Sequence, residues 1–257
     1  MTSARATIPR PSVQIILTSL GRADFVALVK NPRRLLLSFL LPIVLLIVTN
    51  SSKATKHLGG ADYIIGLAIS YGLLSTSILG YALGVARDRE NGVFQRLRVT
   101  PAPTWTIMAS RLGMQVLANF VMALVVVVIG SQMHNVALSV SEYVLVLVIS
   151  LLGGAVFLAI GQALVAFVKS ADTVNAGGRI LFIVLILLGL FGQSGTLGSF
   201  WESISHWSPV GAVMTLFAGV LKVSAWGTQD WLSIVACVGY IVSCAAAGIR
   251  WFRWDAK

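Results

Sequence analysis

The sequence predicts an all-α membrane protein with six transmembrane helices, arranged as one domain over residues 1–257. Three observations support this prediction: an apolar composition, long windows without charge, and an uneven distribution of basic residues. Of the 257 residues, 57% are hydrophobic and only 11% are charged, and the mean hydropathy is +0.88. A soluble domain carries about 25% charged residues, so the composition alone indicates a membrane environment.

Long stretches of the chain contain no Asp, Glu, Lys or Arg. These charge-free windows are 18 to 30 residues long and cover 35–52, 63–86, 112–141, 143–168, 180–201, 203–221 and 231–249. About 20 apolar residues in a helix cross the hydrocarbon core, and lipid offers no partner for unpaired backbone groups, so the spans must be helical. The windows are continuous rather than alternating, which excludes a large transmembrane β-barrel.

The basic residues indicate how the helices are oriented. With the N-terminus in the cytoplasm and six spans, 16 Lys and Arg residues fall in inner segments and 3 in outer segments, Lys53, Lys56 and Lys222. Cytoplasmic loops are enriched in basic residues, so both termini are predicted to be cytoplasmic. The formal net charge of +10 could also suggest nucleic acid, but its distribution favours topology, and no nucleic-acid partner is expected.

The chain before the first span predicts a helix lying in the membrane interface over residues 12–30. Its apolar residues recur at helical spacing and are interspersed with charged ones, a pattern typical of interfacial helices. The alternative is a cytosolic helix that packs against a partner. The predicted spans that follow are 35–50, 63–86, 104–130, 143–168, 179–192 and 231–249.

The second predicted span is more polar than the first. It offers hydroxyl groups that could line a route for a substrate, from Ser70, Tyr71, Ser75, Ser77 and Tyr81. The alternative is helix packing, because small and hydroxylated residues allow close approach between membrane helices.

The segment 196–222 does not fit a full span. It contains an apolar run interrupted by His206 and Pro209, and a seventh span would place the basic C-terminus outside, against the charge rule. A re-entrant or interfacial helical pair at the outer side is therefore predicted before the last span.

The most charged segment of the chain lies between the second and third spans, over residues 87–100. We predict a short amphipathic helix in the cytoplasm whose apolar residues Val93, Phe94 and Leu97 face a partner. The alternative is an ordinary basic inner loop. Gly92 would permit close backbone approach at this site.

Motifs for chemistry within the chain are few. The sequence contains no GxxxxGK[ST] phosphate-binding loop, and its three histidines fall in separate outer segments without metal-ligand spacing. No catalytic or metal-binding residue is therefore expected. The spans also lack Asp, Glu or Lys near their middle, which argues against an ion-coupled carrier.

Three motifs carry a resemblance to a known family. The run Glu90-Asn91-Gly92-Val93-Phe94-Gln95-Arg96-Leu97-Arg98-Val99-Thr100-Pro101 resembles the E-x-G-T-L-E-x-L-x-x-T-P signature of type 2 permeases of ATP-binding cassette (ABC) exporters, which include antibiotic-resistance and polysaccharide exporters. Lys30-Asn31-Pro32-Arg33-Arg34 is similar to the family's entry into its first span, and Trp207-Ser208-Pro209-Val210 to its outer W-x-P-x motif. Val93, Phe94 and Gln95 depart from the signature.

The resemblance implies a permease subunit in a bacterial plasma membrane. Such a subunit pairs with a second copy or a homologue, and each permease docks on a separate ATPase that binds ATP and Mg²⁺; this chain itself would be no enzyme and hold no cofactor. The implied coupling-helix contacts are Arg89, Glu90, Gly92, Val93, Phe94, Arg96 and Leu97. The expected cargo is lipophilic or amphipathic, such as a drug, an antibiotic or a lipid. The alternatives are a polysaccharide or glycolipid exporter, and a membrane scaffold or sensor that transports nothing.

Overall fold

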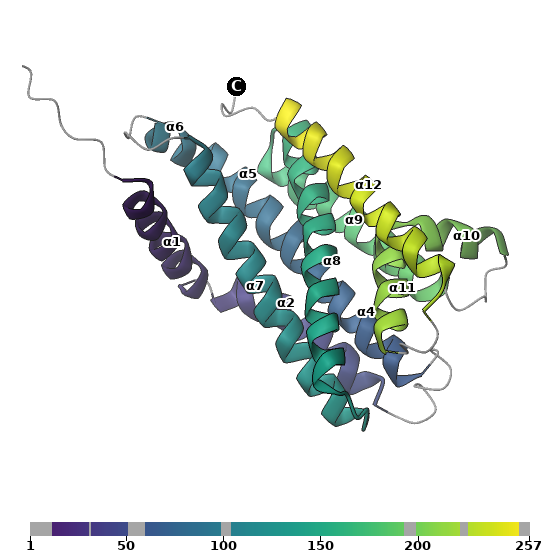
Figure 1. Cartoon of the computed structure of the whole chain (residues 1–257). Coiled ribbons are helices and arrows are strands. Elements are labelled where there is room, and N and C mark those ends of the chain that lie inside the picture. Colours follow the sequence, from purple (N-terminus) through teal and green to yellow (C-terminus); the bar gives the residue numbers. More distant parts are fainter. Residues whose placement is uncertain are drawn as a thin grey trace, which may run out of the picture.

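The computed structural model of the protein describes residues 12–30, 32–50, 60–98, 104–192, 199–221 and 226–251. Every regular element in these ranges is a helix, so the all-α prediction is confirmed (Figure 1). In chain order the helices are α1 Val13–Val29, α2 Pro32–Val48, α4 Ala61–Leu74, η1 Ser75–Ala82, α5 Leu83–Glu90, α6 Val93–Arg98, α7 Thr104–Met133, α8 Val140–Phe167, α9 Ala171–Gly192, α10 Ser199–Trp207, α11 Pro209–Leu221 and α12 Thr228–Trp251.

Five of these helical stretches are long and apolar enough to cross a membrane. They are the continuous run α4–η1–α5 (Ala61–Glu90), then Trp105–Met133, Val140–Phe167, Ala171–Phe191 and Thr228–Trp251. The protein is therefore a multi-pass membrane protein. The described apolar part of α2, Phe39–Val48, is shorter than this, so a sixth span at 35–50 stays a prediction, as does the interfacial position of α1.

Two helix boundaries differ from the sequence-based predictions. The predicted coupling helix 87–100 is split in the structure, because Arg87–Glu90 form the last turn of α5, and the separate helix α6 begins only at Val93. The fifth span begins at Ala171 rather than 179. Gly177 and Gly178 lie inside this continuous helix. An added Cβ at Gly178 would lie 3.2 Å from the Ile78 side chain, so the lack of a side chain there permits close packing between α9 and η1.

Local sequence explains several helix ends. Ser139 and Glu142 form a capping box at the start of α8, which satisfies backbone N–H groups that a helix leaves unpaired. Ser208 precedes α11, and its hydroxyl accepts a hydrogen bond from the Gly211 N–H at 3.0 Å. Pro209 occupies the first helical position, where its missing N–H costs nothing. Helices α10 and α11 lie within the segment 196–222, and the re-entrant helical pair predicted there stays a prediction.

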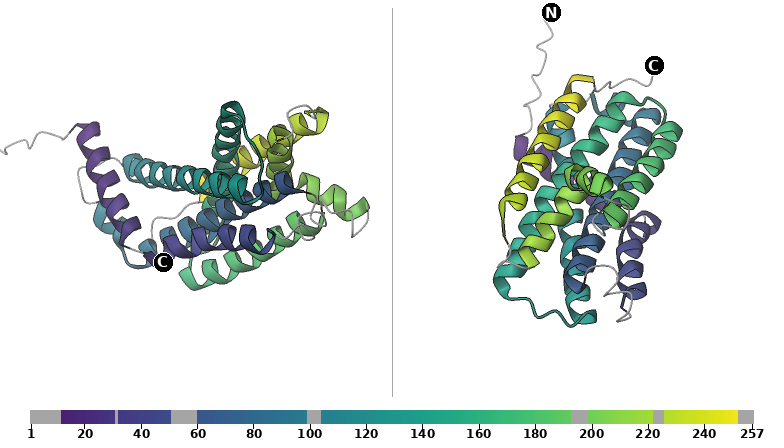
Figure 2. Two further views of the ribbon diagram at one scale, coloured as in Figure 1. Left: turned by 90° about the horizontal axis from the view of Figure 1, so that it is seen from below. Right: turned by 90° about the vertical axis from the view of Figure 1, so that its right-hand side faces the viewer.

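The second span lies at the centre of the bundle. In the stretch Ala61–Glu90, 83% of the most apolar window is buried, against 17% in α12. Helix α11 is also internal, and Val213 and Phe217 on it are fully buried. The long helices run alongside one another in the right-hand view of Figure 2, with α12 at one side of the bundle.

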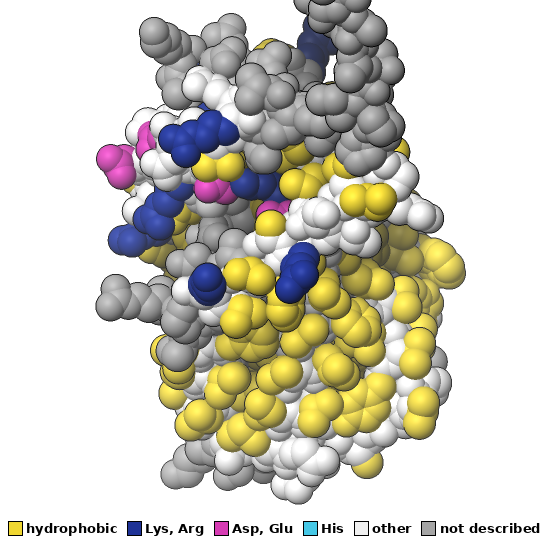
Figure 3. Space-filling model, turned by 90° about the vertical axis from the view of Figure 1, so that its left-hand side faces the viewer, with side chains coloured by type: hydrophobic (Ala, Val, Ile, Leu, Met, Phe, Trp, Pro, Cys, Tyr) yellow, Lys and Arg dark blue, Asp and Glu magenta, His cyan; other side chains and the backbone are white. Residues whose placement is uncertain are grey.

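The outer faces of the bundle are apolar. On α12, for example, Val235, Val242 and Ile249 are 67%, 63% and 82% exposed. Figure 3 shows apolar side chains over the lower part of one face, with Lys and Arg gathered above them. Exposing such an apolar surface to water is unfavourable, whereas contact with lipid tails is not, as expected for a membrane protein.

The charged side chains of Figure 3 belong to one end of the molecule. Helices α5 and α6, the start of α7 and the end of α12 lie together there (Figure 1), and this region is called the α6 end below. Helix α1 packs against α7 beside it. The Asp24 carboxylate on α1 accepts a hydrogen bond from the Ser110 hydroxyl on α7 at 2.5 Å, which holds α1 to the bundle.

Candidate functional site

Arg89, the first of the predicted contact residues, is buried inside the α6 end. It is only 2% exposed, and its guanidinium donates hydrogen bonds to the carbonyl oxygens of Val165, Val168 and Lys169 at 3.0, 2.6 and 2.6 Å. These carbonyls belong to the last turn of α8 and the loop after it. A helix leaves its last carbonyls unpaired and carries partial negative charge at that end, so a cation is stabilising there.

Glu90 contacts the next helix. Its carboxylate accepts a hydrogen bond of 2.6 Å from the backbone N–H of Ala171, the first residue of α9. Helix N-termini carry unpaired N–H groups and partial positive charge, which favour a carboxylate. Two neighbouring residues of opposite charge therefore hold the two ends of the α8–α9 connection, each at the helix end that its charge suits. We call Arg89 and Glu90 the α8–α9 clamp.

A sharp turn separates this clamp from α6. Asn91 caps α5 and its N–H bonds to the Arg87 carbonyl. Gly92 has φ +69°, a left-handed conformation that costs little only for glycine. The turn directs α6 away from the axis of α5 (Figure 1). The close backbone approach predicted at Gly92 stays a prediction.

Phe94 is buried in the bundle, whereas the sequence predicts that it faces a partner from an apolar side of α6. Its ring is 1% exposed and packs with residues of η1, α5, α7, α8 and α9, including Val85, Ile107 and Leu158. The Arg111 guanidinium lies over the ring at 4.8 Å from its centroid. The ring thus faces the bundle and not a partner, because the turn at Gly92 folds α6 back against α5 and α7.

Arg111 joins α7 to the charged segment in a second way. Its guanidinium pairs with the Asp88 carboxylate at an N–O distance of 2.5 Å. Together with the cation–π contact to Phe94, this pair fixes α6 against the start of α7. The ion pair is partly buried, whereas the ring of Phe94 is almost fully buried, so the ring contributes most of the apolar packing here.

The outward side of the charged segment is polar. Arg87, Asn91, Gln95 and Arg96 are exposed, and Val93 is half-buried. The prediction for Leu97 concerns a side chain outside the described part of the structure. Of the predicted contact residues, Glu90 and Arg96 are thus exposed, whereas Arg89 and Phe94 are internal.

The residues predicted to line a pathway are all buried in the second span. Ser70, Tyr71, Ser75, Ser77 and Tyr81 are 0 to 6% exposed. Most of them contact neighbouring helices: the Tyr71 hydroxyl donates to the Ile186 carbonyl on α9 at 2.8 Å, and the Tyr81 hydroxyl to the Gln162 amide oxygen on α8 at 2.8 Å. In this conformation they hold the bundle together, as in the packing alternative.

Sequence analysis missed the polar partners of this span. Asn119 on α7 is 2% exposed and contacts Thr76 and Ser77 on η1, while Gln115 lies one turn away and contacts Asn119. A buried amide within a charge-free window of 30 residues is the signal that could have identified Asn119, because polar groups at membrane depth require partners.

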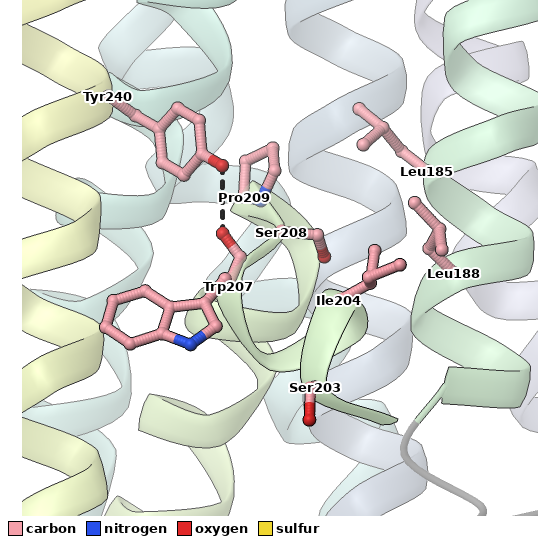
Figure 4. A pocket seen from close by; sticks show the side chains of 8 residues that line it. All are labelled: Leu185, Leu188, Ser203, Ile204, Trp207, Ser208, Pro209 and Tyr240. Carbon is pink, nitrogen blue, oxygen red and sulfur yellow. Dashed lines mark hydrogen bonds between the residues drawn. The ribbon is translucent and has the colours of Figure 1, made fainter. Parts of the chain in front are cut away.

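A separate cavity of about 470 Å³ opens between α9, α10 and α12. Its lining is mostly apolar and comprises Leu185, Leu188, Ser203, Ile204, Trp207, Ser208, Pro209 and Tyr240 (Figure 4). The Tyr240 hydroxyl donates to the Trp207 carbonyl at 2.8 Å, which ties α12 to the turn between α10 and α11. Cavities of about 300–1,000 Å³ hold small molecules.

Comparison with known proteins gives two matches. A family model described as "ABC-2 type transporter" matches residues 17–221. This range includes α6, the α8–α9 clamp and the whole of α11. The chain is also 20% identical, over 225 residues, to a Bacillus subtilis (strain 168) protein described as "Putative transport permease YvfS", covering 86% of this chain and 90% of that protein.

Proposed function

Because the chain belongs to the ABC-2 type transporter family, we propose that it is the transmembrane permease subunit of an ABC exporter. A separate ATPase subunit binds and hydrolyses ATP, and this chain converts its movement into a change in the helix bundle. The α6 end then faces the cytoplasm, with both termini on that side of a bacterial plasma membrane.

The α8–α9 clamp is the observation that carries this proposal. Arg89 and Glu90 end the central, most buried span and contact the ends of two further long helices through four hydrogen bonds of 2.6 to 3.0 Å. A force applied to α6 passes through the Asn91–Gly92 turn to this clamp, and so to α5, α8 and α9 together. A loop that only connects two spans would not need hydrogen bonds that link α5, α8 and α9.

The proposed contact surface for the ATPase is the exposed side of the charged segment. It consists of Arg87, Asn91, Gln95 and Arg96, with Glu90 at its edge. The burial of Phe94 moves the predicted contact from an apolar face to this polar and basic surface. Charged groups at an interface favour specificity and fast association, which suits a complementary acidic groove on the ATPase.

A lipophilic or amphipathic cargo is supported by the apolar character of the bundle. The described cavity is lined largely by Leu, Ile, Pro, Trp and Tyr side chains, and the described spans hold no carboxylate at mid-depth that would select a cation. A second permease copy or a homologue completes the transporter.

Co-purification tests the proposal. The tagged permease is extracted from native membranes in mild detergent, and bound proteins are identified by mass spectrometry and assayed for ATP hydrolysis. We expect an ATPase with a phosphate-binding loop, and we expect its yield to fall when Arg96→Glu reverses the charge on α6. Arg250→Glu, an equal change at an exposed residue of α12, is the matched control.

The proposal predicts that the two variants differ. Retention of the ATPase by both would contradict docking on α6, and absence of any ATP-hydrolysing partner from the wild-type preparation would contradict the exporter assignment itself.

A further inference from the structure

The central span contains an unusual segment between two ordinary helical ones. Helices α4 and α5 are α-helical, whereas the eight residues of η1, Ser75–Ala82, form a π-helix. A π-helix pairs each N–H with the carbonyl five residues earlier, is rare, and occurs mostly at functional sites. Here the π-helix lies in the middle of the most buried span, so contacts with neighbouring helices and not with lipid surround it.

Both sides of this segment are anchored to the same neighbour, α9. Before η1, the Tyr63 and Tyr71 hydroxyls donate to the carbonyls of Gly189 and Ile186 at 2.9 and 2.8 Å. After η1, Glu90 accepts from the first N–H of α9 at 2.6 Å. Because all three contacts are on α9, a displacement of the α6 end relative to the other end of the bundle deforms α9, breaks one of these contacts or is taken up in the central span between them. The irregular part of that span is η1.

One buried side chain on α7 contacts the start of η1. The Asn119 amide oxygen accepts hydrogen bonds from the Thr76 hydroxyl at 2.5 Å and the Gln115 amide at 3.2 Å, and its NH₂ group lies 3.4 Å from the Ser77 hydroxyl. The orientation of the Asn119 amide matches its neighbours, because two donors face its oxygen and an acceptor faces its nitrogen.

Thr76 has two competing acceptors for its single proton. Its hydroxyl oxygen lies 2.5 Å from the Asn119 amide oxygen and 3.0 Å from the Leu73 carbonyl in its own helix. A hydroxyl that bonds back to its own helix competes with the backbone ladder and bends helices. When the Thr76 hydroxyl donates to Asn119, it links η1 to α7. When it donates to the Leu73 carbonyl, the hydrogen bond stays within the second span.

We propose that Asn119 is a positioning residue that holds η1 in its π-helical register, and that η1 changes register when the ATPase displaces the α6 end. Thr76 then exchanges its hydrogen bond from Asn119 to the Leu73 carbonyl, and the parts of the span on either side of η1 shift relative to each other. This inference rests on the proposed function, because it assigns the point in the central span at which the ATPase movement is converted.

Close packing around η1 makes two discrete arrangements more reasonable than a gradual bend. An added Cβ at Gly161 on α8 would lie 3.0 Å from the Ser77 carbonyl oxygen, so α8 touches the backbone of the π-helix. Densely packed interiors pass between distinct arrangements and do not deform continuously.

Hydrogen–deuterium exchange on the complex of permease and co-purified ATPase tests the inference. Exchange of peptides covering 75–82 is compared without nucleotide and after trapping with ATP and orthovanadate. In the wild type we expect a change of about fivefold in exchange rate, as for one hydrogen bond gained or lost. Asn119→Leu and Thr76→Val should abolish this dependence on nucleotide while the ATPase stays bound.

A merely structural role for Asn119 would affect stability without affecting this response. Ser150→Ala on α8 is the matched control, because Ser150 is buried and its hydroxyl bonds to the Val146 carbonyl of its own helix; it should keep the wild-type response. If Asn119→Leu lowers the thermal midpoint, Thr76→Val distinguishes a positioning role from a structural one, since it removes the hydroxyl and preserves the shape of the side chain.

The outcomes separate this inference from the proposed function. Exchange over 75–82 that is the same in both nucleotide states of the wild type, or a nucleotide response that survives in Thr76→Val, overturns the role of η1 and Asn119 while leaving the exporter assignment in place. Failure of the wild-type permease to bind an ATPase overturns the exporter assignment, and with it the coupling assigned to η1.

Discussion

Phe94 shows how strongly a single turn changes the role of a side chain. Its ring belongs to a buried cluster with residues of η1, α5, α7, α8 and α9 and lies under the Arg111 guanidinium. Phe94→Ala should lower the free energy of unfolding by about 3–5 kcal/mol, as for a large buried aromatic. Denaturation in detergent micelles measures this change.

The neighbouring Gln95 provides the control for this prediction. Gln95→Ala changes an exposed residue on the same helix and should alter the free energy of unfolding by no more than about 0.5 kcal/mol. Equal stabilities for the two variants would show that the ring is not part of the core.

Arg89 leads to a second prediction. Arg89→Ala removes the donor from three carbonyls at the end of α8 and should destabilise that end by about 1–3 kcal/mol, the cost of unsatisfied buried polar groups. Hydrogen–deuterium exchange should rise in peptides covering 165–171. Arg96→Ala, at an exposed position of α6, should leave that exchange unchanged; a similar rise in both variants would contradict the clamp.

The sequence identified these charged residues but not their partners. In an apolar chain, Arg89 and Glu90 stand out equally whether they contact another protein or the ends of helices within the chain. Arg89 bonds to backbone carbonyls, and carbonyls occur at every residue, so no pattern of side chains could indicate that contact. Asn119 differs, because an amide side chain inside a charge-free window is itself a visible signal.

Among the elements, the turn between α10 and α11 depends on one glycine. A Cβ at Gly211 would lie 1.7 Å from the Ser205 carbonyl oxygen, a distance that only a movement of the backbone could relieve. Gly211→Ala should therefore separate α10 from α11, enlarge the cavity beside Tyr240 and lower the thermal midpoint by several degrees.

Gly239→Ala on α12 is the matched substitution. No atom lies within 4 Å of an added Cβ there, and alanine favours a helix over glycine, so its thermal midpoint should equal or exceed that of the wild type. A Gly211→Ala variant as stable as Gly239→Ala would show that α10 and α11 are not packed as described.

Helix existence was predicted well and helix boundaries less well. Long charge-free windows identify the five long apolar helices because a membrane span needs both length and low charge. Helix α9 begins at Ala171, eight residues before the predicted start of the fifth span, and Gly178 inside it provides room for Ile78. The π-helix at Ser75–Ala82 was not predicted, because the sequence reads there as one continuous apolar run over 63–86.

At the level of the whole molecule, the orientation in the membrane can be tested directly. The α6 end carries the basic residues that the charge rule places in the cytoplasm. Green fluorescent protein fused after residue 257 should fluoresce and alkaline phosphatase fused there should be inactive. The reverse should hold for fusions in the segment between α7 and α8, after Leu138. Equal reporter activity at both sites would contradict the three spans predicted between them, because an odd number of spans places the two sites on opposite sides of the membrane.

Docking of an ATPase on the exposed side of α6 can be tested by photo-crosslinking. A photo-crosslinking amino acid placed at Gln95, which is exposed on α6, is compared with one at Val235, which is 67% exposed on the apolar face of α12. After irradiation of intact cells, we expect a covalent adduct between position 95 and an ABC ATPase, and no such adduct from position 235. An ATPase adduct at position 235 but not at position 95 would show that the ATPase does not dock on α6.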